Sequence, residues 1–262
     1  MKTKASAILI ALVFRLMTFL PIAHAVVPLP DGCYPGFTTA EGCNALKFLT
    51  TGLGNTGIGW YSLYVNTTGS FNTGVGGGAL ALNDADSNTA VGAAALLLNT
   101  TGTENVAVGT DALVYNDTGS QNSAFGAFAL FNNTTGIENT AIGDSALLNN
   151  SIGAVNTAVG WGALFANTSS QENTAVGYRA LGNNQPSNFN TAVGGNALLN
   201  TTGGYNTAIG KDALVTNSTG NANTAVGPTA LFSNTTGSGN TAVGFSTLFS
   251  NTTGGDNTGL GP

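Results

Sequence analysis

The sequence is dominated by a tandem repeat of 17 residues, which constrains its fold more than any other feature. From Asn55 onward the chain repeats the line N-T-A-[VI]-G-x-x-A-L-x-x-N-T-T-G-x-x thirteen times, and the copies that begin at Asn72 and Asn190 are one residue shorter. The fifth position is Gly in every copy, and the ninth is Leu in every copy that reaches it. Such self-similarity indicates an array in which each repeat packs on its neighbours.

The repeat is too short for a pair of helices, and its fixed Gly, Asn and Thr positions are costly inside a helix. We expect T-A-V-G to form a short strand that ends at a glycine with positive φ. We expect A-L-x-x-N to form a second short strand or extended segment, and N-T-T-G to form a turn. Stacked in register, these units predict an all-β chain: a β-solenoid of the parallel β-roll or β-helix type, with about twelve turns and a small N-terminal cap.

The predicted core consists of two apolar columns, the fourth-position Val or Ile and the ninth-position Leu. In the central copies these residues are Val91, Leu96, Val108, Leu113, Phe125, Leu130, Ile142 and Leu147. Asn recurs in the same way at the first and twelfth positions, and identical stacked amides can donate and accept hydrogen bonds along a column. We therefore expect two Asn ladders along the rod. The second is broken only in the copy that begins at Asn190, where Asn200 comes one place early.

The N-terminal segment has the pattern of a secretory signal peptide. Lys2 and Lys4 precede an apolar run that ends in A-H-A before Val26, as at a signal cleavage site. Arg15 interrupts the apolar run, so an uncleaved N-terminal anchor is the alternative. We predict a secreted protein, extracellular or at the cell surface, with no membrane span after signal cleavage. The expected domains are residues 1–25, the signal peptide; 26–54, the N-terminal cap; and 55–262, the repeat solenoid.

Composition argues against catalysis. Only 7% of the residues are charged, and the net charge is −6, which is unsuited to binding nucleic acid or an anionic membrane surface. The one histidine, His24, lies in the predicted signal peptide, so the mature chain has no imidazole to activate a nucleophile or to bind zinc. The acidic residues fall at scattered repeat positions and form no column of calcium ligands. We expect no enzymatic activity, no cofactor and no metal site.

Two cysteines, Cys33 and Cys43, lie in the segment expected to form the cap. An exported chain meets an oxidising compartment, so we expect a local disulfide between them; a metal site with only two thiolates is the less favoured alternative. The same segment offers side chains that can cover the first turn of the solenoid: Tyr34, Phe37, Leu46 and Phe48.

The array resembles two groups of proteins. Its N-T-A-V-G-x-x-A-L-x-x-N-T-T-G unit looks like the repeats of secreted bacterial repeat proteins and phage-type tail fibres. It is more distantly similar to the head repeats of trimeric autotransporter adhesins, which have a shorter N-S-x-A-[IV]-G unit. The resemblance covers residues 55–262. It implies a parallel trimeric β-roll and a role in attachment.

The sixth and seventh positions vary among the copies, which is typical of a solvent-facing turn. Their aromatic side chains can stack on surface glycans, pack against a neighbouring chain, or simply cover the Leu column. The candidate binding residues are Trp60, Tyr61, Phe128, Trp161, Tyr178 and Phe245.

The N-T-T turns also create a row of N-x-[ST] sequons. The predicted glycosylation sites are Asn66, Asn99, Asn116, Asn133, Asn167, Asn200, Asn217, Asn234 and Asn251, and the alternative is that N-T-T only serves the turn. The second-position Thr column suggests ice binding, as a third hypothesis. We disfavour it because the Thr residues are expected to lie beside buried Ala and Val.

The function we expect is structural. The repeat stops within a thirteenth copy at residues 257–262, so we expect the rung formed by residues 240–256 to leave strand edges, Phe245 and Leu248 accessible. This predicts self-association, as an end-to-end filament or a trimer. The favoured hypothesis is a subunit of an extracellular fibre or surface assembly that also serves adhesion. The alternative is a carbohydrate-binding adhesin or tail-fibre shaft.

Overall fold

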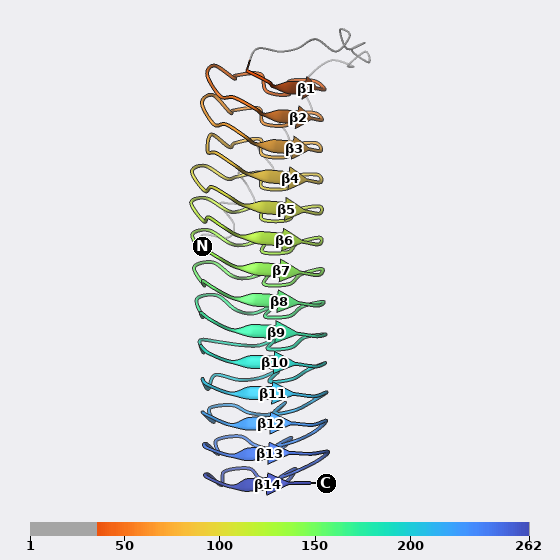
Figure 1. Cartoon of the computed structure of the whole chain (residues 1–262), viewed down its shortest axis with the longest axis vertical. Coiled ribbons are helices and arrows are strands. Elements are labelled where there is room, and N and C mark those ends of the chain that lie inside the picture. The colour runs from red at the N-terminus through yellow and green to blue at the C-terminus, as the bar shows by residue number, and fades with distance from the viewer. Residues whose placement is uncertain (1–35, 262) are drawn as a thin grey trace, which may run out of the picture. The chain divides into compact units, whose positions relative to one another are not determined.

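The structure, a computed structural model, describes residues 36–261. Over these residues the chain forms a β-solenoid, in which fourteen short parallel strands lie one above another in chain order (Figure 1). Each strand pairs with the strand of the next repeat, so the sheet runs from β1 to β14 without a crossover. The predicted fold class is confirmed. The predicted signal peptide lies outside the described residues.

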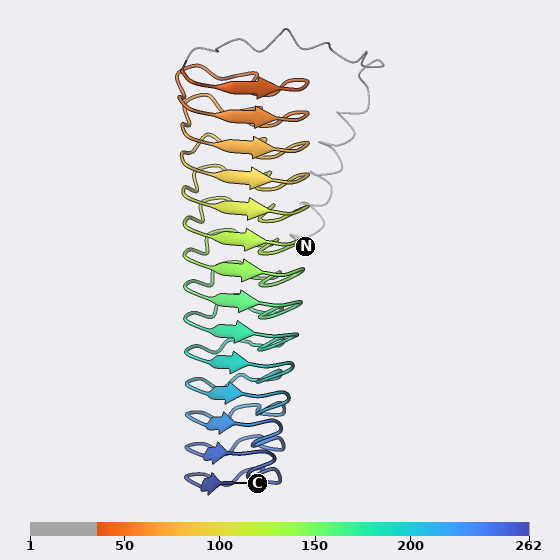
Figure 2. The same cartoon turned by 45° about the vertical axis from the view of Figure 1, so that its right-hand side comes forward.

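Each strand has three residues and occupies positions two to four of the repeat. The strands are β1 (Thr39–Glu41), β2 (Thr56–Ile58), β3 (Thr73–Val75), β4 (Thr89–Val91), β5 (Val106–Val108), β6 (Ser123–Phe125), β7 (Thr140–Ile142), β8 (Thr157–Val159), β9 (Thr174–Val176), β10 (Thr191–Val193), β11 (Thr207–Ile209), β12 (Thr224–Val226), β13 (Thr241–Val243) and β14 (Thr258–Leu260). The shortened repeats keep the register, because Thr73 still pairs with Thr89 and Thr191 with Thr207. Figure 2 shows that the strands turn only slowly about the long axis of the stack.

The segment A-L-x-x-N is not a second strand, so this part of the prediction is wrong. It forms successive tight turns in which the ninth-position Leu takes a left-handed conformation, with φ of 54° at Leu113. The turns bond alternately within a rung and to the next one: Asn116 N–H donates to Leu113 O at 3.2 Å, and Leu113 N–H donates to Ala129 O at 3.0 Å. The N–H and C=O groups in these bonds are those that a second strand would have needed for pairing in a sheet.

The fifth-position Gly ends each strand because no other residue fits there. Gly109 has φ of 138°, which L-residues rarely adopt. A Cβ added to it would lie 2.5 Å from Gly126 O in the next rung. Each glycine in this column therefore allows the close approach of the following turn.

The core consists of the Leu column and two Ala columns. Leu96, Leu113, Leu130 and Leu147 are fully buried, as predicted. The Ala residues at the third and eighth positions, such as Ala107 and Ala112, are fully buried as well. These Leu and Ala side chains form one continuous cluster of buried apolar residues along the described rungs.

The fourth-position column lies outside the core, which corrects the prediction. The exposed fraction is 38% for Val91, 41% for Phe125 and 43% for Ile142, and Val108 is half-buried. Successive side chains of a strand point to opposite faces. Since Ala in the middle of T-A-V points inward, Thr and Val both point outward.

The solenoid begins earlier than predicted. Residues 38–54 form a complete rung, because β1 pairs with β2 in the common register and Leu46 extends the Leu column at 7% exposure. The boundary between cap and solenoid at residue 54 is therefore wrong over the described part of the cap. Phe37 and Phe48 do not cover the first rung, since they are 94% and 47% exposed. Tyr34 lies outside the described residues.

Two Asn ladders run through the interior, as predicted. In the first-position ladder, Asn122 Nδ2 donates to Asn105 Oδ1 at 3.2 Å. In the twelfth-position ladder, Asn116 Nδ2 donates to Asn99 Oδ1 at 2.7 Å. Both ladders are tied to the backbone, because Gly119 O accepts from Asn105 Nδ2 and from Asn116 Nδ2, each at 2.8 Å. Within residues 36–261, no buried side-chain nitrogen or oxygen lacks a partner.

In the first shortened repeat, which begins at Asn72, a side-chain carboxylate replaces a backbone carbonyl as hydrogen-bond acceptor. In a full repeat, the carbonyl of the thirteenth residue accepts three N–H bonds from the turn of the preceding rung, as Asp117 O does from residues 100–102. Where the turn is one residue short, Asp84 Oδ1 takes these bonds from Thr67, Thr68 and Gly69 at 2.8, 2.7 and 3.2 Å. Partial burial acts to raise the pKa of Asp84, but the bonds from Thr68, Thr67 and Gly69 outweigh it and hold the pKa below its ordinary value of 3.8.

In the second shortened repeat, which begins at Asn190, a hydroxyl side chain stands in place of the missing Asn. Thr201 occupies the ladder position that Asn200 misses, is fully buried, and accepts a hydrogen bond from Asn217 Nδ2 at 3.1 Å. The sequence alone shows a break in the Asn column at this rung. The structure shows that the ladder resumes at Thr201 but is interrupted before it, because Thr201 Oγ1 donates to Gly203 O and Asn184 Oδ1 accepts from Ser187 Oγ instead.

Candidate functional site

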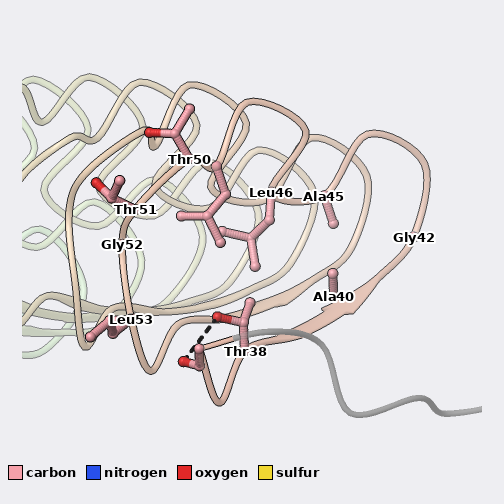
Figure 3. A pocket seen from close by; sticks show the side chains of 11 residues that line it. Thr38, Ala40, Gly42, Ala45, Leu46, Thr50, Thr51, Gly52 and Leu53 are labelled. Atoms are coloured by element: carbon pink, nitrogen blue, oxygen red, sulfur yellow. Dashed lines mark hydrogen bonds between the residues drawn. The ribbon is translucent and has the colours of Figure 1, made fainter.

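The first candidate site in the described chain is a recess at one end of the solenoid. A recess of about 690 Å³ lies at the N-terminal end of the solenoid (Figure 3). Its lining consists of backbone, small residues, threonines and three leucines, and Leu46 points into it. None of the lining residues is titratable. The recess lies at the N-terminal end of the Leu and Ala core, and its only polar side chains are the threonine hydroxyls.

Residues 36–261 contain no group of three or more His, Cys, Asp or Glu side chains placed to share a metal ion. Over the same range, the structure has no helix with the length and apolar character needed to cross a membrane. The predicted disulfide cannot be placed, because Cys33 lies outside the described residues, whereas Cys43 is exposed on the first rung.

The outer face of the sheet is the most regular surface. It carries the second and fourth repeat positions of all fourteen strands, and we call it the Thr–Val face. The second position is Thr in every strand except β5 and β6, and the fourth is apolar in every strand except β1. Only one side chain on this face, Glu41, is ionisable. The face is long, neutral and periodic, and sequence reasoning missed it by placing the fourth position in the core.

The hydroxyls of the turns and those of the Thr–Val face are used differently. Turn hydroxyls bond from rung to rung: Thr134 Oγ1 donates to Ser151 O at 2.9 Å, and Thr235 Oγ1 donates to Thr252 O at 2.9 Å. Within the described chain, none of the second-position Thr hydroxyls makes a hydrogen bond to protein, although these side chains are half-buried or exposed. The hydroxyls on this face therefore have no hydrogen-bond partner among residues 36–261.

The predicted binding aromatics lie on the surface but do not form one site. Trp60, Phe128, Trp161, Tyr178 and Phe245 are 40%, 39%, 48%, 55% and 64% exposed, and Tyr61 is half-buried. Trp161 and Tyr178 lie in neighbouring rungs, and their rings stack with centroids 5.1 Å apart. Phe128 packs edge-on against Phe131 of its own rung.

The largest aromatic group lies near the N-terminal end, and we call it the aromatic cluster. It consists of Phe48, Trp60, Tyr61 and Tyr64, whose successive ring centroids lie 4.5–5.0 Å apart. Lys47 Nζ lies 5.7 Å from the ring centroids of Phe48 and Tyr64. Sequence reasoning found two of its rings and missed the others, because Tyr64 and Phe48 occupy the tenth and eleventh positions of their rungs. The repeat applied to residues 38–54 would have indicated Phe48.

The structure overturns most of the predicted glycan row. Seven of the nine sequon asparagines are fully buried: Asn66, Asn99, Asn116, Asn133, Asn167, Asn217 and Asn234. Their amide nitrogens, where a glycan would be attached, already donate within the twelfth-position ladder. In the folded rod these seven cannot be glycosylated, and N-T-T serves the turn and the ladder. Asn200 is exposed and Asn251 is half-buried.

At the last described rung, β14 pairs with β13 alone. Leu260 is 78% exposed, Phe245 is exposed and Leu248 is half-buried. Self-association at this end stays a prediction. Comparison with protein-family models gives no match, and comparison with curated proteins gives none either. The resemblance to adhesin heads and tail fibres therefore also stays an expectation from the repeat.

Proposed function

We propose that the chain is an extracellular structural protein, a subunit of a fibre or surface assembly that also serves adhesion. The observation that supports this best is the unbroken, in-register stack of fourteen strands, in which the interior amides are all paired. Thirteen strand spacings of about 4.8 Å give a rod of about 62 Å. A rod of this kind resists bending, because every rung is bonded to the next along its whole outline.

Electron microscopy tests the assembly. The mature chain, residues 26–262, is imaged by negative stain over a series of concentrations, and sedimentation is measured in parallel. Filaments, or a larger particle whose fraction grows with concentration, support the proposal. Discrete monomeric rods at the highest concentration contradict it.

The proposed export needs its own test. The full chain is produced with its N-terminal segment in a bacterial host, and the mature protein is sequenced from its N-terminus. We expect the protein outside the cytoplasm, with Val26 as its first residue. A cytoplasmic product that retains Met1 contradicts this part of the proposal.

A carbohydrate-binding adhesin is the second candidate, and the aromatic cluster is the observation that favours it. Partly exposed Trp and Tyr rings give a flat apolar surface with polar tips, which suits the faces of sugars. We propose that Trp60 would be the main stacking residue, since it is 40% exposed and packs edge-on against Tyr61.

The test compares Trp60→Ala with a matched control, Phe37→Ala, on a glycan array. Phe37 is 94% exposed and is not part of the aromatic cluster. Loss of glycan binding in Trp60→Ala alone supports the adhesin candidate. Absence of glycan binding by the unmodified chain, or equal loss in both variants, contradicts it.

A further inference from the structure

The Thr–Val face has properties that a structural rod does not require. The longest uninterrupted part is β7–β13, where all seven strands present Thr at the second position and Val or Ile at the fourth. To its N-terminal side, Val106 replaces Thr in β5, and β6 carries Ser123 and the bulky Phe125. The regular part therefore spans six strand spacings, or about 29 Å, along the rod.

The side chains of this region form a two-dimensional lattice. Register places Thr opposite Thr and Val opposite Val or Ile in adjacent strands. This gives a spacing of about 4.8 Å along the rod and about 6.6 Å between the two columns. Thr, Val and Ile are all β-branched and stiff at χ1. The hydroxyls and methyls are therefore held in place before any partner binds, which lowers the entropic cost of binding.

The chemistry of the face narrows the class of partner. The seven strands β7–β13 carry no charge on this face, although the chain is acidic as a whole. A charged polymer or an anionic lipid surface would require charged side chains. An apolar protein partner would leave the seven Thr hydroxyls buried and unpaired, which is costly. A neutral, periodic partner that accepts and donates hydrogen bonds can bond to the Thr hydroxyls and still contact the Val and Ile methyls.

We propose that the β7–β13 part of the Thr–Val face binds ice. The Thr hydroxyls, which have no partner among the described residues, hydrogen-bond to water molecules of the lattice, and the Val and Ile methyls fill the spaces between them. The column spacings are on the scale of the separations between water molecules in ice. This activity goes beyond the proposed structural role and does not depend on filament formation.

The fourth-position residues decide this inference. A buried Val column would leave a single row of Thr hydroxyls, which cannot match a two-dimensional lattice. Val193 and Ile209 are 37% and 41% exposed, and they complete the second row.

The test measures thermal hysteresis and uptake of the labelled mature chain into growing ice. Thr191→Tyr puts a bulky neutral group at the centre of the region, in β10. Thr219→Tyr is the matched control, because Thr219 is exposed on the turn of the next rung, away from the Thr–Val face. Circular dichroism checks that both variants keep the β fold. We expect the unmodified chain and Thr219→Tyr to give hysteresis and to enter the ice, and Thr191→Tyr to lose most of both.

Four results would overturn the proposal. The first is an unmodified chain that gives no hysteresis and is excluded from ice. The second is equal loss in the two variants. The third is a sedimentation result in which the unmodified chain self-associates, Thr191→Tyr is monomeric and neither enters ice, because the face would then contact a second copy. Retention on insoluble cellulose without ice uptake would also overturn it, in favour of a polysaccharide. Filament formation is scored separately, so failure here leaves the proposed function intact.

Discussion

The buried Asn ladder allows a sharp comparison between two adjacent residues of the same type. Asn133 is fully buried, donates from Nδ2 to Asn116 Oδ1 at 2.7 Å and to Gly136 O at 3.0 Å, and accepts from Asn150 Nδ2 at 2.8 Å. Its neighbour Asn132 is half-buried, and its Nδ2 donates to a single side-chain oxygen at 3.1 Å. The substitutions Asn133→Ala and Asn132→Ala therefore remove the same atoms from two different environments.

The structure gives the expected magnitudes. In Asn133→Ala, Asn116 Oδ1 loses its donor and Asn150 Nδ2 loses one of its two acceptors, while Gly136 O keeps its bond from Asn122. One buried oxygen and one buried N–H are then left unpaired, because Asn150 Nδ2 keeps only its bond to Gly153 O, and each unpaired group costs about 1–3 kcal/mol, or about 2–6 kcal/mol together. Asn132→Ala is expected to change the free energy of unfolding by about 0.5 kcal/mol, as for most surface positions.

The assay is urea denaturation of residues 26–262, followed by circular dichroism. We expect the midpoint of Asn133→Ala to fall well below those of Asn132→Ala and the unmodified chain. Because a repeat array can unfold from its ends, amide exchange of the rungs on both sides of residue 133 checks that the loss is local. Equal, small shifts in both variants would refute the reasoning that the ladder stabilises the rod.

Three further outcomes follow from packing and charge. Leu130→Asp should lower the free energy of unfolding by several kcal/mol, because it places an unpaired charge in the buried Leu column. Phe125→Asp on the outer face should lower it much less, and the urea midpoints of the two variants measure the difference. Gly74→Ala should destabilise the chain, because the added Cβ would lie 2.5 Å from Ser62 Oγ, and Ser62→Ala in the same chain should restore part of the loss in a double-mutant cycle. The pKa of Asp84 is lowered on folding, so its ionised form stabilises the rod at pH values above the ordinary pKa, and that contribution is lost as the pH falls through the folded pKa. The free energy of unfolding, measured against pH in the acid range, should therefore change less in Asp84→Asn than in the unmodified chain.

The repeat predicts the fold because each column of the sequence becomes a column of the structure. The ninth-position Leu and the two Asn ladders were predictable, since an invariant residue in every rung has the same neighbours above and below. The fourth position was misplaced for a physical reason. An apolar residue on a strand stabilises its cross-strand neighbours on either face of a sheet, so its constancy does not reveal the face. The third position, which is always Ala or Gly, was the sign that the strand points inward there, because only a small side chain fits against the Leu column.

The candidate surfaces were harder to predict from the sequence. The second-position Thr column was visible in the sequence, but the fourth-position Val or Ile column was assigned to the core. The predicted face therefore had one column of side chains where the structure has two. The sequons were read as exposed because turns usually lie at the surface, whereas the twelfth-position side chain points inward from its turn. The degenerate rung at residues 38–54 keeps only Thr39, Ala40, Gly42, Ala45 and Leu46 and the turn of the repeat. That remainder was too sparse to identify as a repeat before the pairing of β1 with β2 was known.

The central claim is that each repeat adds one rung to a single in-register parallel stack. Pulsed electron paramagnetic resonance tests it most directly, with spin labels at Thr73 in β3 and at either Thr140 in β7 or Thr207 in β11, in a chain whose cysteines are replaced by Ser. The label pairs lie four and eight rungs apart, so we expect backbone separations of about 19 and 38 Å, at about 4.8 Å per rung. Equal distances for the two pairs, or a broad distribution for both, would contradict the stacked solenoid.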